Sequence, residues 1–162
     1  MRVALTSFAL FLATASAAFA QDASVRFMER PMTDEFVDRV LAAATTALPA
    51  ALGDDGQPLP PLSAAQQGQP LLDRDLVREV IDVGFASGIG HVCGLDWTQS
   101  NFLPLMRRER ARGDRSQHQI AVIAIVHGVI QGQVADSGGA CGPNGAAAAT
   151  DFYQRKWGSP DG

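Results

Sequence analysis

The stretch S-Q-H-Q-I-A-V-I-A-I-V-H-G-V-I-Q-G-Q-V-A, residues 116–135, decides the fold class of this chain. From Ile120 to Ile130 only His127 is polar. The β-branched residues of this run would also suit a strand, but its length and its glutamine-bearing flanks favour a helix. Because apolar side chains lie almost all round this helix, we expect it at the centre of the protein. The run is too short and too interrupted to cross a bilayer, so we predict no transmembrane segment.

The central helix carries small residues along one side. At 100° per residue they fall within a stripe about 80° wide. The residues of this stripe are Ala121, Ala124, Gly128, Gly132 and Ala135. A smooth stripe lets another backbone come close, and an earlier helix offers Gly84 and Gly88, four residues apart. We predict that the two helices touch there; the alternative is a groove for a flat ligand.

Two helices are predicted before the central one from their caps and apolar spacing. The segment 33–48 has Thr33 as its expected N-cap, with two acidic residues in the first turn. The next helix is expected to begin after Asp73 and to carry apolar residues at helical spacing as far as Phe85. A glycine-rich stretch, containing Gly84, Gly88 and Gly90, is expected to end it.

A third helix is expected to run to about Arg112, and a short last helix covers 146–157. Pro104 would break a helix interior, but it is tolerated in the first turn, where amide hydrogens have no helical partner. This predicts a start at Ser100 or Asn101. Asp96 is expected to cap the turn that follows the cysteine-containing loop.

The first twenty residues predict export. Arg2 supplies a positive start, an apolar run follows from 3 to 13, and Ala18 and Ala20 place small residues at a cleavage site. This pattern is typical of a secretory signal peptide, and the run is shorter than the ~20 residues of a membrane anchor. We therefore expect the mature protein in the periplasm or secreted beyond it.

Cys93 and Cys141 are the only cysteines. In an oxidising compartment two thiols usually pair, which predicts a disulfide closing a loop of about 50 residues and worth ~4 kcal/mol in the chain-entropy model. A metal thiolate or a nucleophilic cysteine beside His91 is the alternative. The predicted fold is all-α: a small four- or five-helix bundle around the central helix, stapled by this disulfide. The predicted parts are a signal peptide (1–20), a leader (21–32), an N-terminal helix (33–48), a Pro/Gly/Gln-rich linker (49–70), a disulfide-linked helical core (71–158) and a tail (159–162).

Charge limits the possible partners. The chain has 13 basic and 17 acidic residues, a net charge of −4. This balance argues against binding to nucleic acid and leaves an unknown protein or a small molecule as the partner. A solvated helix end is the favoured explanation of the arginine-rich run 107–115, which remains the best surface candidate for a partner contact. Its candidate residues are Arg107, Arg108, Arg110 and Arg112.

Histidines and acids give a weak site prediction. His118 and His127 are nine residues apart and point to opposite sides of one helix, and no H-x-x-x-H or C-x-x-C spacing occurs. We therefore predict no metal and no cofactor. A ligand pocket near the disulfide is expected to be lined by His91, Asp96, His127 and Gln131.

The leading functional hypothesis is an exported, non-enzymatic helical module that binds a ligand or a partner. It rests on the absence of an assembled catalytic motif in the sequence. One alternative is a periplasmic metal- or haem-binding protein that uses His127 and His91. Another is a hydrolase with His127 as its base.

Overall fold

The computed structural model describes residues 32–137 and 139–158, and these residues form helices and loops. The elements are α2 (Asp34–Ala47), the 3₁₀-helix η1 (Leu48–Ala50), α3 (Arg74–Val92), the π-helix η2 (Thr98–Phe102), α4 (Leu103–Ala111), α5 (Gln117–Asp136) and α6 (Gly145–Trp157). No strand occurs in the described ranges, so the predicted all-α fold is confirmed. The predicted signal peptide and tail, and the leader up to residue 31, lie outside the described residues.

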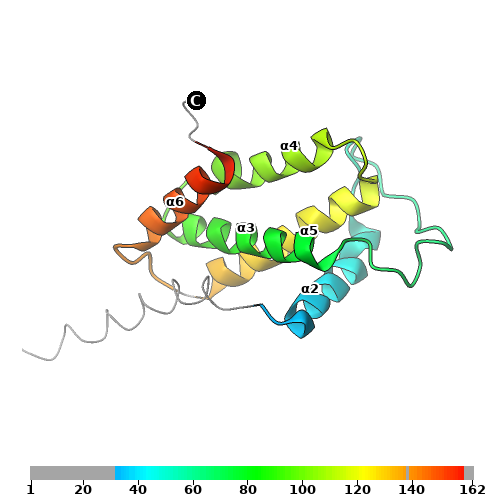
Figure 1. Ribbon diagram of the computed structural model, residues 1–162, viewed down its shortest axis with the longest axis horizontal. Helices are drawn as coiled ribbons and strands as arrows, with labels where there is room; N and C mark the ends of the chain where they lie inside the picture. Colours follow the sequence, from blue (N-terminus) through cyan, green and yellow to red (C-terminus); the bar gives the residue numbers. More distant parts are fainter. Residues whose placement is uncertain (1–31, 138, 159–162) are drawn as a thin grey trace, which may run out of the picture.

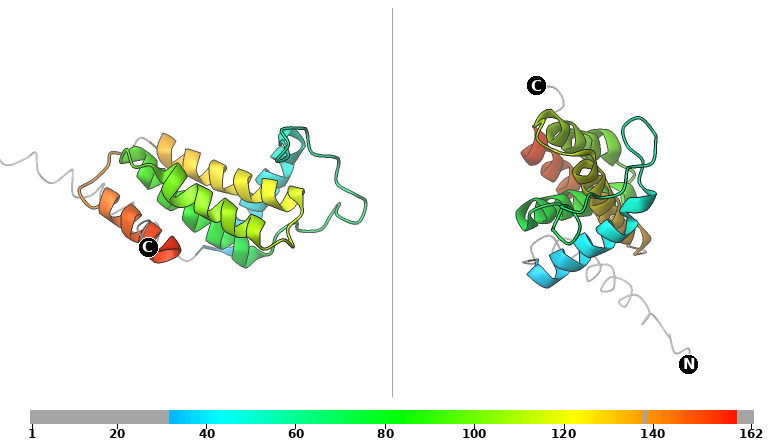
Figure 2. Two further views of the ribbon diagram at one scale, coloured as in Figure 1. Left: turned by 90° about the horizontal axis from the view of Figure 1, so that it is seen from above. Right: turned by 90° about the vertical axis from the view of Figure 1, so that its right-hand side faces the viewer.

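The helices α3 and α5 pack side by side and form the most extensive contact of the bundle (Figure 1). The helix α2 crosses them on one side, and α4 and α6 lie toward the other (Figures 1 and 2). Aliphatic residues of both helices are inaccessible to solvent, among them Val77, Val80, Ile81, Ile123 and Ile130. The helix α5 is long and apolar enough to span a membrane, but much of it is buried inside the protein. The predicted absence of a transmembrane segment stays a prediction.

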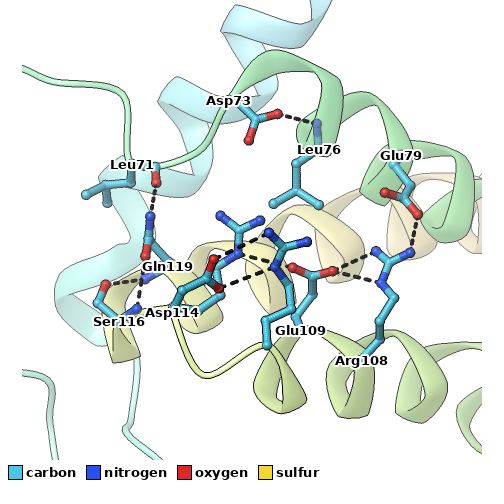
Figure 3. Close-up of polar contacts among 11 residues, drawn as sticks. Leu71, Asp73, Leu76, Glu79, Arg108, Glu109, Asp114, Ser116 and Gln119 are labelled. Atoms are coloured by element: carbon cyan, nitrogen blue, oxygen red, sulfur yellow. Dashed lines mark hydrogen bonds and ion pairs between the residues drawn. The ribbon is translucent and has the colours of Figure 1, made fainter.

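Local sequence signals set the helix starts. The Thr33 hydroxyl accepts a hydrogen bond from the Phe36 amide, and Asp73 caps α3 through the Leu76 amide at 2.8 Å. Both predicted caps are confirmed. At the start of α5, Ser116 and Gln119 bond to each other's backbone amides in a capping box (Figure 3).

The prediction that glycines end the second helix is wrong, because α3 continues to Val92. Gly84 and Gly88 are buried where α3 meets α5. A Cβ on Gly88 would lie 2.4 Å from Val134 Cβ, closer than side-chain carbons approach. Close packing therefore offsets the roughly 1 kcal/mol that each glycine costs a helix.

The small-residue stripe of α5 does not make this contact. The two predicted helices do touch at Gly84 and Gly88, but these glycines face Ile130 and Val134. A Cβ added to Gly128 would meet no atom within 4 Å. Glycines on α3 that face the large side chains of Ile130 and Val134 leave less empty space than small residues on both helices would. The glycines of α3 alone therefore permit the close approach.

The third helix starts earlier than predicted. Residues from Trp97 onward are helical, and the Leu103 amide bonds to the Thr98 carbonyl, five residues back, as in a π-helix. Pro104 removes the amide that an α-helix would direct at Ser100, and the wide turn lies over this position. The predicted cap is confirmed, since Asp96 Oδ1 accepts from the Gln99 amide at 3.1 Å.

The segment 51–72 projects from the end of the bundle opposite α6 (Figure 2). Most of it is exposed, yet Leu59 and Leu62 pack against the core. His118 Nε2 donates to the Pro60 carbonyl at 2.7 Å, and Gln119 donates to the Leu71 carbonyl at 2.9 Å. The predicted linker is thus fastened to α5 at two points. At the other end of the bundle the predicted disulfide between Cys93 and Cys141 is confirmed.

Candidate functional site

A groove with a volume of about 590 Å³ lies between two helical walls. One wall is formed by the loop before η2, by η2 and by α4: Leu95, Asp96, Gln99, Ser100, Pro104 and Arg107. The other wall is formed by α6 and the residue after it: Thr150, Tyr153, Gln154, Trp157 and Gly158. The α6 residues recur at three- and four-residue intervals, so one face of that helix lines the groove.

Two hydrogen bonds fix the α6 wall. Tyr153 Oη donates to the Ala86 carbonyl at 2.9 Å, and Trp157 Nε1 donates to Asn101 Oδ1 at 2.7 Å. Burial raises the pKa of Tyr153, which therefore stays a donor at neutral pH. Gly90 makes room for this phenol, since a Cβ there would lie 2.1 Å from Tyr153 Oη. The groove is therefore preformed.

A buried polar network continues from Trp157 into the core. Asn101 Nδ2 donates to the Val83 carbonyl at 2.8 Å and to Ser87 Oγ at 2.9 Å, and Ser87 Oγ lies 2.9 Å from His127 Nε2. An indole is only a donor, so it fixes the orientation of the Asn101 amide. With Asn101 donating to it, the Ser87 hydroxyl can direct its own proton at a neutral His127.

Burial also favours a neutral His127, because it lowers the pKa of the imidazole to about 4. The side chain is 2% exposed, and the rings of Trp97 and Phe102 lie against it with centroids at 5.8 and 4.7 Å. His127 is not among the residues that line the groove. Through Ser87, His127 joins α5 to α3, and Asn101 extends this network from Ser87 to η2.

The structure separates the four predicted pocket residues. Asp96 lines the groove, where it also caps η2. His91 is exposed on the last turn of α3, with its ring centroid 6.3 Å from that of Trp97. His127 is buried, and the Gln131 carbonyl faces Gly88 at the α3–α5 contact. Only Asp96 belongs to the groove.

Three of the four candidate partner-surface arginines pair within the chain. Arg108 bonds to Glu79 and Glu109 (Figure 3), and its guanidinium lies 5.2 Å from the Trp157 ring centre. Arg110 pairs with Asp54 at 2.7 Å, and Arg112 with Asp114 at 3.3 Å. Arg107 pairs with no carboxylate in residues 32–137 and 139–158, and it lines the groove.

Several groove residues were missed from the sequence, notably Gln99, Ser100, Thr150 and Gln154. The signal that could have found Thr150 and Gln154 is their position beside Tyr153 and Trp157 on one face of the last helix.

Within the described part of the chain, no three His, Cys, Asp or Glu side chains gather closely enough to hold a metal ion. Comparison of the chain with protein-family models, curated proteins and solved structures finds no match.

Proposed function

We propose that this protein is an exported, non-enzymatic binding module whose ligand occupies the groove between η2–α4 and α6. The observation that carries this proposal is the preformed groove itself. Its volume of about 590 Å³ falls in the range of small-ligand pockets, and its lining combines apolar surface from Leu95, Pro104 and Trp157 with polar side chains. The hydrogen bonds of Tyr153 and Trp157 hold its α6 wall without a ligand.

Export is supported by two independent features. The sequence carries a signal-peptide pattern at its start, and Cys93 and Cys141 form a disulfide, which persists in oxidising compartments. The intact mass of protein recovered from outside the cytoplasm should lack residues 1–20 and two hydrogens. A full-length chain with two alkylatable thiols would contradict this part of the proposal.

Ligand binding is tested by filling the groove. Gln154→Trp places a large ring in the groove, and Arg155→Trp places the same ring on the adjacent exposed residue, which does not line it. A mixed library of short peptides, sugars and organic acids is screened by amide chemical-shift changes in the wild-type protein. We expect a ligand that shifts groove residues and is lost only in Gln154→Trp. A library without any groove ligand, or binding unchanged in Gln154→Trp, would refute the proposal.

A second candidate function follows from one distance. Ser87 Oγ and His127 Nε2 are 2.9 Å apart, the separation of a nucleophile and its base in serine hydrolases. Both residues are buried, so a substrate would reach them only after η2 moved. A fluorophosphonate probe that labels the wild-type protein at Ser87, but not Ser87→Ala, would support a hydrolase. Labelling absent from both proteins would assign the pair a structural role alone.

A further inference from the structure

The groove carries opposite charges near its two ends. Asp96 precedes η2, and Arg107 lies eleven residues later in the same continuous helical stretch. At a rise of 1.5 Å per residue, these positions are about 16 Å apart along the helix axis. The groove is therefore long, with an acid toward one end and a base toward the other.

The helix α6 runs in the same direction as η2 and α4. Near the first end, Tyr153 and Trp97 both adjoin Gly90. Farther along, Trp157 bonds to Asn101 and lies beneath the Arg108 guanidinium. The two helical walls of the groove therefore run parallel, both in the direction from Asp96 to Arg107.

The charged group at each end keeps free bonding capacity. The described arginines that have carboxylate partners are Arg39, Arg74, Arg78, Arg108, Arg110, Arg112 and Arg115. Acidic residues outnumber basic ones, 17 to 13, yet Arg107 has no such partner among the described residues. Asp96 uses Oδ1 to cap η2, while its Oδ2 accepts no hydrogen bond from the described part of the chain. An unpaired guanidinium is a bidentate site for a carboxylate, and an exposed carboxylate suits an ammonium.

Amide side chains flank the groove between these ends. Gln99 lies on η2 and Gln154 on α6, so each wall carries an amide side chain that can both donate and accept hydrogen bonds. A peptide backbone presents the same alternation of donors and acceptors. Pro104 and Trp157 supply apolar surface for the side chains of such a ligand.

We propose that the groove binds a short, extended peptide with free termini, its ammonium group at Asp96 and its terminal carboxylate at Arg107. This inference rests on the proposed function of the groove. An extended chain advances about 3.3 Å per residue, so a span of about 16 Å takes four or five residues. Charge at both ends sets the direction of the peptide and its length.

The test uses synthetic pentapeptide pools with randomised residues in three forms: free termini, C-terminal amide and N-terminal acetyl. Binding is measured by equilibrium dialysis and mass spectrometry. Against wild-type protein, amidation and acetylation should each weaken binding at least tenfold. Arg107→Gln should remove the effect of amidation only, and Asp96→Asn, which keeps a capping side chain, should remove the effect of acetylation only. Arg155→Gln, which removes the other described arginine lacking a carboxylate partner, should bind like wild type.

The possible results distinguish failure of the peptide proposal from failure of the proposed ligand-binding function. Peptide binding that is indifferent to the termini, or unchanged in Arg107→Gln, would overturn the inference. A sugar or an organic acid that binds the wild type and is lost in Gln154→Trp, with no pentapeptide bound, would overturn the inference and leave the proposed function standing. A groove that binds no member of any pool or library would overturn both.

Discussion

Gly88 of α3 and Val134 of α5 lie so close that a Cβ added to Gly88 would stand 2.4 Å from Val134 Cβ. Gly84 repeats the relationship one turn earlier, where a Cβ would lie 2.9 Å from Ile130 Cβ. The distance between the two central helices is therefore set by glycines on α3. Asn101 and Tyr153 both bond to backbone carbonyls of α3, so α3 also anchors both walls of the groove.

Gly88→Ala should lower the free energy of unfolding by about 1–3 kcal/mol, since overpacking strains the contact with Val134 by more than alanine's helix propensity returns. Gly128→Ala is the matched control on α5. Its added Cβ meets no atom within 4 Å, so it should raise the free energy of unfolding by about 0.5–1 kcal/mol. Urea denaturation of both variants measures the difference. Equal effects would mean that α3 and α5 are farther apart than described.

Apart from the disulfide, the correct predictions from sequence depend on neighbouring residues, and the errors arose where the answer depends on distant ones. Apolar periodicity and the caps at Thr33 and Asp73 are local, and both gave correct helices. The glycines of α3 have low helix propensity, which predicts an end; only the facing Ile130 and Val134 explain why the helix continues. The small residues of α5 were wrongly predicted to face the glycines of α3. Periodicity shows that small residues share one side of a helix, but it does not show what that side contacts.

The candidate site was harder to predict for the same reason. Asp96 was predicted as a cap and as a pocket residue, yet nothing local shows that Gln99 and Gln154 line the same groove. The arginine run was predicted as a partner surface, but Arg110 pairs within the chain with Asp54, which is 56 residues away. Only the assembled fold shows which arginine remains unpaired.

Glu109→Gln should lower the free energy of unfolding by about 3 kcal/mol. Glu109 is 1% exposed, accepting a bond from Arg108 Nε at 2.8 Å and pairing with Arg115 Nε at 3.2 Å. Loss of its charge leaves the partly buried Arg115 guanidinium without a counter-ion and leaves Arg108 with Glu79 alone. Glu35→Gln breaks an exposed pair with Arg39 and should cost less than about 0.5 kcal/mol. Similar thermal shifts for the two variants would show that Glu109 is accessible to water.

His127 predicts a loss of stability in acid. Burial lowers its folded-state pKa to about 4, while the unfolded chain titrates near 6.5. Between these values the unfolded state binds a proton that the folded state does not. The contribution of His127 to the free energy of unfolding is therefore at its maximum above pH 6.5. It falls by about 3 kcal/mol as the pH drops to 4. Imidazole carbon shifts of His127 should not change between pH 8 and 5; a midpoint near 6.5 would place this ring in water.

The titration of Asp82 should offset part of the stability that the titration of His127 removes in acid. Burial raises the pKa of its carboxyl to about 6, so the folded state holds a proton between pH 6 and 4 that the unfolded state releases. Asp82→Asn removes this compensation. The free energy of unfolding should therefore fall more steeply between pH 6 and 4 in this variant than in the wild type. Chemical denaturation at pH 6, 5 and 4 measures both slopes, and parallel slopes would contradict the raised pKa of Asp82.

The disulfide should stabilise the bundle and, with it, the position of the α6 wall. Cys93 caps the end of α3, and Cys141 lies four residues before α6, at a sequence separation of 48 from Cys93. Replacing both with serine should lower the free energy of unfolding by ~4 kcal/mol, because the unfolded chain regains the freedom of a long loop. The Trp157–Asn101 hydrogen bond lies at the other end of α6 and should persist in the folded fraction. Urea denaturation followed by tryptophan fluorescence measures the stability, and the indole proton shift of Trp157 reports the bond. Unchanged stability in the double variant would mean that α6 is held by Tyr153 and Trp157 alone.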